Sequence, residues 1–83
     1  MTAEVNRTSV IFEVKLLLQE QLAWARRAHR SVFESFNKIT DRLEDLGMDM
    51  GFVPVEPLVI GPGFREARVV LAFRDHTEAE VAV

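Results

Sequence analysis

The chain has 83 residues, including 10 Lys or Arg, 13 Asp or Glu and no Cys, so its formal net charge is −3. This length predicts one small domain that is marginally stable without a partner, and the lack of Cys excludes disulfides and thiolate zinc sites. The acidic balance disfavours nucleic acid as a partner. No apolar run is long enough to cross a membrane and the first residues lack the order of a signal peptide. We therefore expect a cytoplasmic or virion-associated protein.

Residues 1–7 are expected to form a flexible N-terminus, and residues 8–46 contain no Gly or Pro and predict one long helix. Thr8 or Ser9 suits the N-cap, and Gly47 suits the end of the helix. The position opposite the apolar seam is charged in every heptad, which is typical of a coiled-coil-like helix. The two heptad rows are Ile11, Leu18, Ala25, Val32, Ile39 and Leu46, and Lys15, Leu22, His29, Phe36 and Leu43.

A helical hairpin is the alternative. "SVFE", residues 31–34, matches a capping box that would start a second helix after a turn in "RRAHR", residues 26–30. That turn would lack Gly and Pro, and the heptad runs through it in phase. The pattern therefore favours the continuous helix, with a break near residues 26–31 left open.

Residues 51–75 predict a β-hairpin. The runs 52–60 and 66–74 are rich in Val, Leu, Ile and Phe, and the second run alternates as a half-buried strand does. Between them, Pro62 and Gly63 occupy the central positions of "GPGF" and suit a type II turn.

Two prolines inside the first run, Pro54 and Pro57, exclude a central strand, because proline cannot donate to a ladder. The run is therefore expected to be extended or to form a sheet edge. The tail, residues 76–83, also alternates and is either a short third strand or a frayed end.

The predicted helix needs more cover than the hairpin supplies. A helix over residues 8–46 would be about 60 Å long, whereas a typical strand covers about 20 Å. Leaving large apolar side chains in water forfeits roughly 1.5–3 kcal/mol each. The predicted fold class is therefore α+β, one long N-terminal amphipathic helix followed by a C-terminal β-hairpin, in a homo-oligomer. Leu22 and Leu43 in one row with β-branched residues in the other favour a trimer, with a dimer or tetramer as alternatives.

The segment "GFVPVEP" resembles the start of the foldon, the C-terminal trimerisation domain of phage fibritin. The shared pattern falls on Gly51, Phe52, Val53, Pro54 and Pro57, and the resemblance covers residues 51–73. It implies a trimer whose extended residues pack around a threefold axis beneath a coiled coil. The chain departs from that family at Leu58–Ile60, where the foldon becomes charged and turns.

The expected oligomer interface follows from the seam and the extended segment. Its residues are Ile11, Leu18, Leu22, Ala25, Val32, Phe36, Ile39, Leu43, Leu46, Phe52, Val53, Pro54 and Pro57. A candidate patch for an acidic partner lies in "WARRAHR", at Trp24, Arg26, Arg27 and Arg30. A solvated helix surface, with Arg stems covering apolar neighbours, is the favoured interpretation of this patch.

Candidate chemistry is sparse. His29 and Lys15 fall in a core row, where a polar residue more often fixes register than binds a ligand. "DHTE", residues 75–78, offers one His beside carboxylates, which is a poor metal signature. We predict no catalytic residues, no metal site and no cofactor, and therefore no enzyme.

The expected function is a non-enzymatic, self-associating assembly module. One alternative is a small acidic inhibitor or accessory protein, of a phage or mobile-element type, that binds a larger protein. A second is a ligand-binding protein with its pocket between subunits, near the "GPGF" tip.

Overall fold

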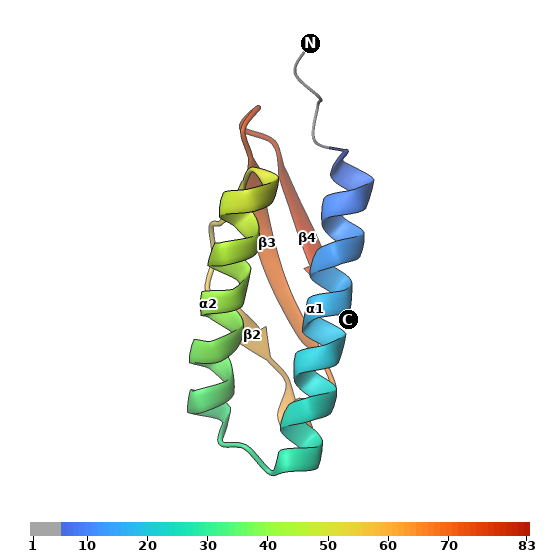
Figure 1. The fold of residues 1–83 in the computed structure, drawn as a ribbon, viewed down its shortest axis with the longest axis vertical. Coiled ribbons are helices and arrows are strands. Elements are labelled where there is room, and N and C mark those ends of the chain that lie inside the picture. The colour runs from blue at the N-terminus through green and yellow to red at the C-terminus, as the bar shows by residue number, and fades with distance from the viewer. Residues whose placement is uncertain (1–5) are drawn as a thin grey trace.

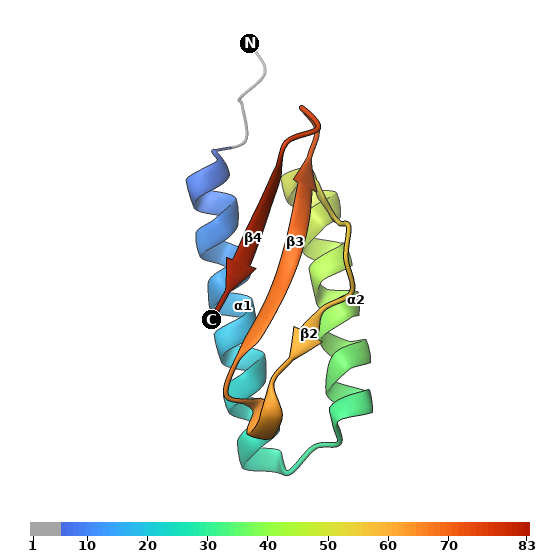
Figure 2. The ribbon, with the colours of Figure 1, turned by 180° about the vertical axis from the view of Figure 1, so that it is seen from behind.

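The computed structural model describes residues 6–83. Of the N-terminus expected to be flexible, residues 1–7, the first five lie outside the described part, whereas Asn6 and Arg7 form the start of α1. Two helices lie side by side on one face of an antiparallel sheet, so the α+β class is confirmed (Figures 1 and 2). In chain order the elements are α1 (Arg7–Ala28), α2 (Val32–Met50), β1 (Phe52–Pro54), β2 (Val59–Ile60), the 3-10 turn η1 (Pro62–Phe64), β3 (Ala67–Phe73) and β4 (Glu78–Ala82).

The prediction of one long helix is wrong, because the helix breaks after Ala28. His29 adopts the left-handed conformation (φ 52°, ψ 41°), and the N–H of Arg30 donates to Ala25 O at 3.1 Å. His is one of the few residues other than Gly that enter this region at modest cost, so a helix end can form here without Gly. The helical hairpin left as the alternative is the observed fold.

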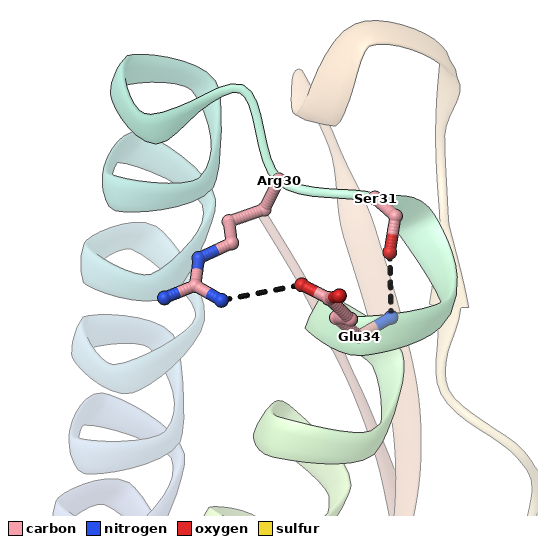
Figure 3. A network of polar contacts seen from close by, with 3 residues as sticks. All are labelled: Arg30, Ser31 and Glu34. Carbon is pink, nitrogen blue, oxygen red and sulfur yellow. Dashed lines mark hydrogen bonds and ion pairs between the residues drawn. The ribbon is translucent and has the colours of Figure 1, made fainter.

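The second helix begins where the capping box predicted it. Ser31 Oγ accepts the N–H of Glu34 at 3.1 Å, as Figure 3 shows. The Glu34 carboxylate pairs with the guanidinium of Arg30 at 3.2 Å (Figure 3). The loop is thus fixed by a helix cap and an ion pair next to each other, both on exposed side chains.

Two observed helix ends also differ from the predicted ones. Asn6 caps α1 in place of Thr8 or Ser9, accepting the Thr8 N–H at 2.9 Å. Gly47 lies inside α2, which ends at Gly51 with φ 82°. A Cβ on Gly47 would lie 2.4 Å from the carbonyl oxygen of Phe52, so glycine here allows close approach of β1 to α2.

β3 is the central strand. Ala72 pairs with both Val53 and Glu78, and Arg68 pairs with both Val59 and Ala82. β1 and β2 therefore form one interrupted strand along one edge of β3, and β4 forms the other edge (Figure 2). The expected hairpin is thus present, and the tail adopts the strand alternative.

The prolines and glycines of this region sit where their backbone preferences fit. The predicted "GPGF" turn forms: the Phe64 N–H donates to Gly61 O at 3.2 Å, and Gly63 has φ 68°. Val53 pairs with Ala72 of β3, and Val55 donates its N–H to Val70 O of the same strand. Because successive backbone groups alternate in direction, the nitrogen of Pro54 points away from the ladder, to the free edge.

The core lies between the helices and the inner face of the sheet. Its members come from α1, α2, the interrupted edge strand, β3 and β4. Six residues of the expected oligomer interface are at most 4% exposed within this core: Leu18, Leu22, Ala25, Ile39, Leu43 and Phe52. The helical hairpin shortens the molecule to 46 Å, so one chain covers these side chains without a second copy.

The other members of the expected interface lie outside the fully buried core. Four are half-buried: Ile11, Phe36, Leu46 and Pro54. Val32, Val53 and Pro57 are exposed. Of the residues in the extended segment, Phe52 packs inside its own chain, while Val53 remains available to a partner.

Candidate interaction surfaces

Residues 6–83 leave one face of the sheet uncovered, because both helices lie on the other face (Figure 2). Val53, Val55 and Val59 are exposed on this open face by 63%, 44% and 47%. We call these three residues, which follow the interrupted edge strand, the valine column. A solvated face of an antiparallel sheet is ordinarily polar, so an apolar column on it indicates a binding surface.

Charged side chains lie at both ends and in the middle of the open face. At one end, strand pairing sets Val53, Ala72 and Glu78 side by side. At the other end, it sets Val59, Arg68 and Ala82 side by side. The middle of the face carries Val70 beside Glu80. Glu66 accompanies Arg68 at one end, Arg74 lies near Val53 and Ala72 at the end that carries Glu78, and Glu80 is the charge in the middle.

A cavity of about 630 Å³ adjoins the valine column where α2 meets β1. Its walls are mainly apolar, and Met48, which is 81% exposed, stands at its side. Glu44, Arg74 and His76 are the ionisable residues in its lining. The volume lies within the range of small-ligand sites. Val53 and Ala72 belong both to the cavity and to the open face, so the two surfaces are continuous.

The predicted Arg patch is divided among structural roles. The charged groups of Arg30 and Lys38 both lie close to the Trp24 ring, at 4.5 and 3.9 Å from its centroid. Arg26 donates a hydrogen bond to the carbonyl of Phe64 and ties α1 to the η1 turn. Arg27 is exposed. Three of the four residues thus stabilise the chain's own packing, as the solvated-surface interpretation expects.

The ionisable groups form no chemical centre within the described chain. His29 lies in the helix–helix loop, Lys15 is exposed on α1, and His76 lies in the β3–β4 turn with φ 67°. Among residues 6–83, no group of three or more His, Asp or Glu side chains is arranged to hold a metal ion.

Asp75 has a shifted pKa with a local cause. Its Oδ1 accepts hydrogen bonds from the hydroxyl and the backbone N–H of Thr77, and these lower the pKa of the carboxyl below its ordinary value. The same bonds hold the turn from β3 to β4. A fully exposed carboxylate held this way organises a turn and has no need of a catalytic role.

No protein-family model, no curated protein and no solved structure matches this chain. Within residues 6–83, no helix is both long enough and apolar enough to cross a membrane. The exposed surfaces of the molecule are therefore the observations that bear on its function. The alternation of residues 66–74 predicted which face of β3 is buried. It carried no information on the valine column, because the prolines interrupt alternation in the edge strand.

Proposed function

We propose that this protein is a non-enzymatic assembly module that self-associates by burying the open face of its sheet against a second copy. The valine column carries the proposal. Three exposed valines in line on one strand, with Val70 and Ala72 half-buried beside them, make an apolar strip that the chain itself leaves uncovered. Face-to-face packing of two sheets at about 10 Å is the common way to bury such a strip.

The self-complementary shape of the valine column favours a second copy as the occupant. Consider a twofold axis that lies between the two sheets and runs perpendicular to the strands. It reverses, in the second copy, the order along the strands of the sets of paired residues named above. The valine columns then lie on each other in antiparallel directions. The set that contains Arg68 then lies on the set of the second copy that contains Ala72 and Glu78, whereas the middle set places Glu80 opposite Glu80 at the edge of the contact. Each subunit thus places Arg68 near the other's Glu78, and the apolar columns are desolvated together.

The solution mass tests this contact, measured by light scattering after size exclusion. We expect a mass of at least two chains for the wild-type protein and a reduced mass for Val53→Lys, because stacking would bury the new ammonium group. Val53 is 63% exposed, so the fold should survive, as circular dichroism would show. Asn37→Lys adds the same charge to an exposed site on α2 and should leave the mass unchanged. A wild-type mass of one chain at all concentrations would refute the proposal.

A mass of three chains would also refute the twofold arrangement and would support the resemblance of residues 51–73 to the foldon. That resemblance remains a prediction. Its segment leaves α2 through the left-handed Gly51 and buries Phe52 in its own chain, so only the exposed Val53 and Pro57 remain free for a threefold contact.

A second candidate function is binding to a larger protein, as an inhibitor or accessory factor. Met48 and Phe33, which are 81% and 75% exposed on α2, favour it, because flexible apolar side chains suit a binding surface that adapts to its partner. Thermal-shift measurements on Met48→Ser and Phe33→Ser are informative here. Unchanged or raised stability, with unchanged mass, would mean that these side chains serve neither folding nor self-association.

A further inference from the structure

The free edge of β4 is a second unpartnered surface. The backbone groups of Ala67 and Val83 bond each other in both directions, and the Phe73 N–H donates to Thr77 O. Odd-numbered residues of this strand therefore face β3. The N–H and C=O groups of Glu80 and Ala82 point outward instead, and both residues are exposed. Within residues 6–83, the bond recorded at this edge is from Arg7 to Glu78 O, at 3.4 Å.

The helix under β4 adds an apolar flank on the same side. Gln21 and Trp24 line a small hollow against α2, so they mark the side of α1 that faces α2. Phe12 lies nine positions before Gln21, and at about 100° per residue it points half a turn away. Phe12 is 58% exposed and is followed one turn later by Leu16, which is 36% exposed. We call these two residues the Phe12 flank. Figure 2 shows α1 and β4 together at the side of the molecule opposite α2.

We infer that this edge pairs antiparallel with β4 of a second copy, forming one continuous sheet across two chains. Antiparallel pairing of identical strands is self-complementary, because a twofold axis perpendicular to the sheet relates the two copies. All helices then lie on one side of the joined sheet, and the Phe12 flank of each α1 faces the same flank of the second copy. The inference rests on the proposed self-association but uses a different surface.

The charges select the register. Only the even-numbered residues of β4 point their backbone N–H and C=O groups outward, so even residues must pair with even residues. One such register sets Glu80 opposite Glu80 of the second copy, which like-charge repulsion disfavours. Shifting the pairing by two residues sets Glu80 opposite Ala82 of the second copy, and Ala82 opposite its Glu80. Both residues then exchange N–H and C=O bonds in both directions, and Val81 lies beside Val81 of the second copy. We therefore expect the register centred on Val81.

The edge contact uses outward backbone groups of β4, whereas the valine-column contact uses side chains on the open face, so both can exist in one assembly of four chains. Glu80→Pro separates them. It removes only an outward N–H, because the N–H groups that bond β3 belong to odd-numbered residues. Glu80→Ala is the matched control, since it loses the same charge and keeps the N–H. We expect light scattering to give four chains for the wild type and for Glu80→Ala, and two for Glu80→Pro.

Two further measurements keep the result interpretable. Hydrogen exchange at the Ala82 amide should be slow in the wild type and fast in Glu80→Pro, since pairing alone protects an outward amide. Phe12→Ser, which leaves the strand untouched, should also lower the mass to two chains. The edge contact is overturned if Glu80→Pro keeps the wild-type mass, or if the Ala82 amide exchanges fast in the wild type.

The two contacts fail distinguishably. A wild type of two chains that Val53→Lys dissociates and Glu80→Pro does not would retain the proposed function and refute the edge contact. A wild type of two chains that only Glu80→Pro dissociates would support the edge contact and refute the valine-column contact. Val53→Lys combined with Glu80→Pro should give single chains. A larger mass would contradict the conclusion that these two contacts account for the whole assembly.

Discussion

At the scale of single residues, Asp75 and Thr77 determine how the chain enters its last strand. The carboxylate of Asp75 accepts two hydrogen bonds from Thr77, and the Phe73 N–H donates to Thr77 O at 2.9 Å. Arg7, whose guanidinium lies 4.7 Å from the Phe73 ring, joins the start of α1 to the same turn. Hydrogen bonds within the turn and the contact from α1 therefore both position the start of β4.

The Asp75 pKa gives a test of this turn. The folded-state pKa is lowered, chiefly by the Thr77 hydroxyl and then by its N–H, so the stabilisation is present above the unfolded-state pKa of about 4 and disappears as pH falls through the folded-state pKa. Thr77→Val removes the hydroxyl donor. We expect the Asp75 pKa to rise toward its ordinary value in an NMR titration of the carboxyl carbon. Thr8→Val is the control, and identical Asp75 titrations in wild type and Thr77→Val would contradict the assignment.

Single residues also show what a sequence can and cannot predict here. Ser31 and Pro62 act through their nearest neighbours, so their cap and turn were predictable from three or four letters. His29 acts through a left-handed conformation that many residues avoid and His merely tolerates. That conformation is stabilised by the packing of α1 against α2, which no short stretch of sequence encodes.

At the scale of elements, the misleading signal was the unbroken heptad. Leu18, Leu22 and Ala25 face the core from α1, and Ile39 and Leu43 face it from α2. Each helix needs its own apolar stripe toward the same sheet, and the short loop happens to keep the two stripes in phase. Hydrophobic period alone cannot distinguish one long helix from two that fold back on one sheet.

The contact between α2 and β1 depends on Gly47. Alanine at an ordinary helix position stabilises by up to about 1 kcal/mol relative to glycine. Here its Cβ would lie 2.4 Å from Phe52 O, so backbone must shift, and we expect Gly47→Ala to lower the free energy of unfolding by roughly 1–3 kcal/mol. Urea unfolding measures this. Asp45→Ala, at an exposed site on the same helix, should change it by less than about 0.5 kcal/mol, and a stabilised Gly47→Ala would contradict the close approach.

At the scale of the whole molecule, the α+β class and the extended, proline-bearing segment followed from the sequence, because both depend on local patterns. The sequence did not predict what covers the apolar seam. The seam was expected to contact other copies, but six residues of the expected interface are buried within one chain. The exposed surfaces include the valine column, the β4 edge, the Phe12 flank, and Phe33 and Met48 on α2, and they can be recognised only once the elements are placed.

Self-association predicts a melting temperature that rises with chain concentration, because mass action favours the assembled, folded state. Differential scanning calorimetry over a wide concentration range measures this. Val53→Lys combined with Glu80→Pro should melt at a temperature independent of concentration. A wild-type melting temperature that does not change with concentration would mean that the stability comes from contacts within one chain.

The two edges of the sheet are chemically unequal, and this inequality limits growth. Pro54 removes an outward donor from the β1–β2 edge, and Pro57 lies in the break between those two strands. A sheet with two usable edges would recruit strands indefinitely and end as a fibre. In the proposed pairing, the strand edge that residues 6–83 leave exposed in each copy is the one interrupted by prolines. We therefore expect the joined sheet to stop at two chains rather than grow into a fibre.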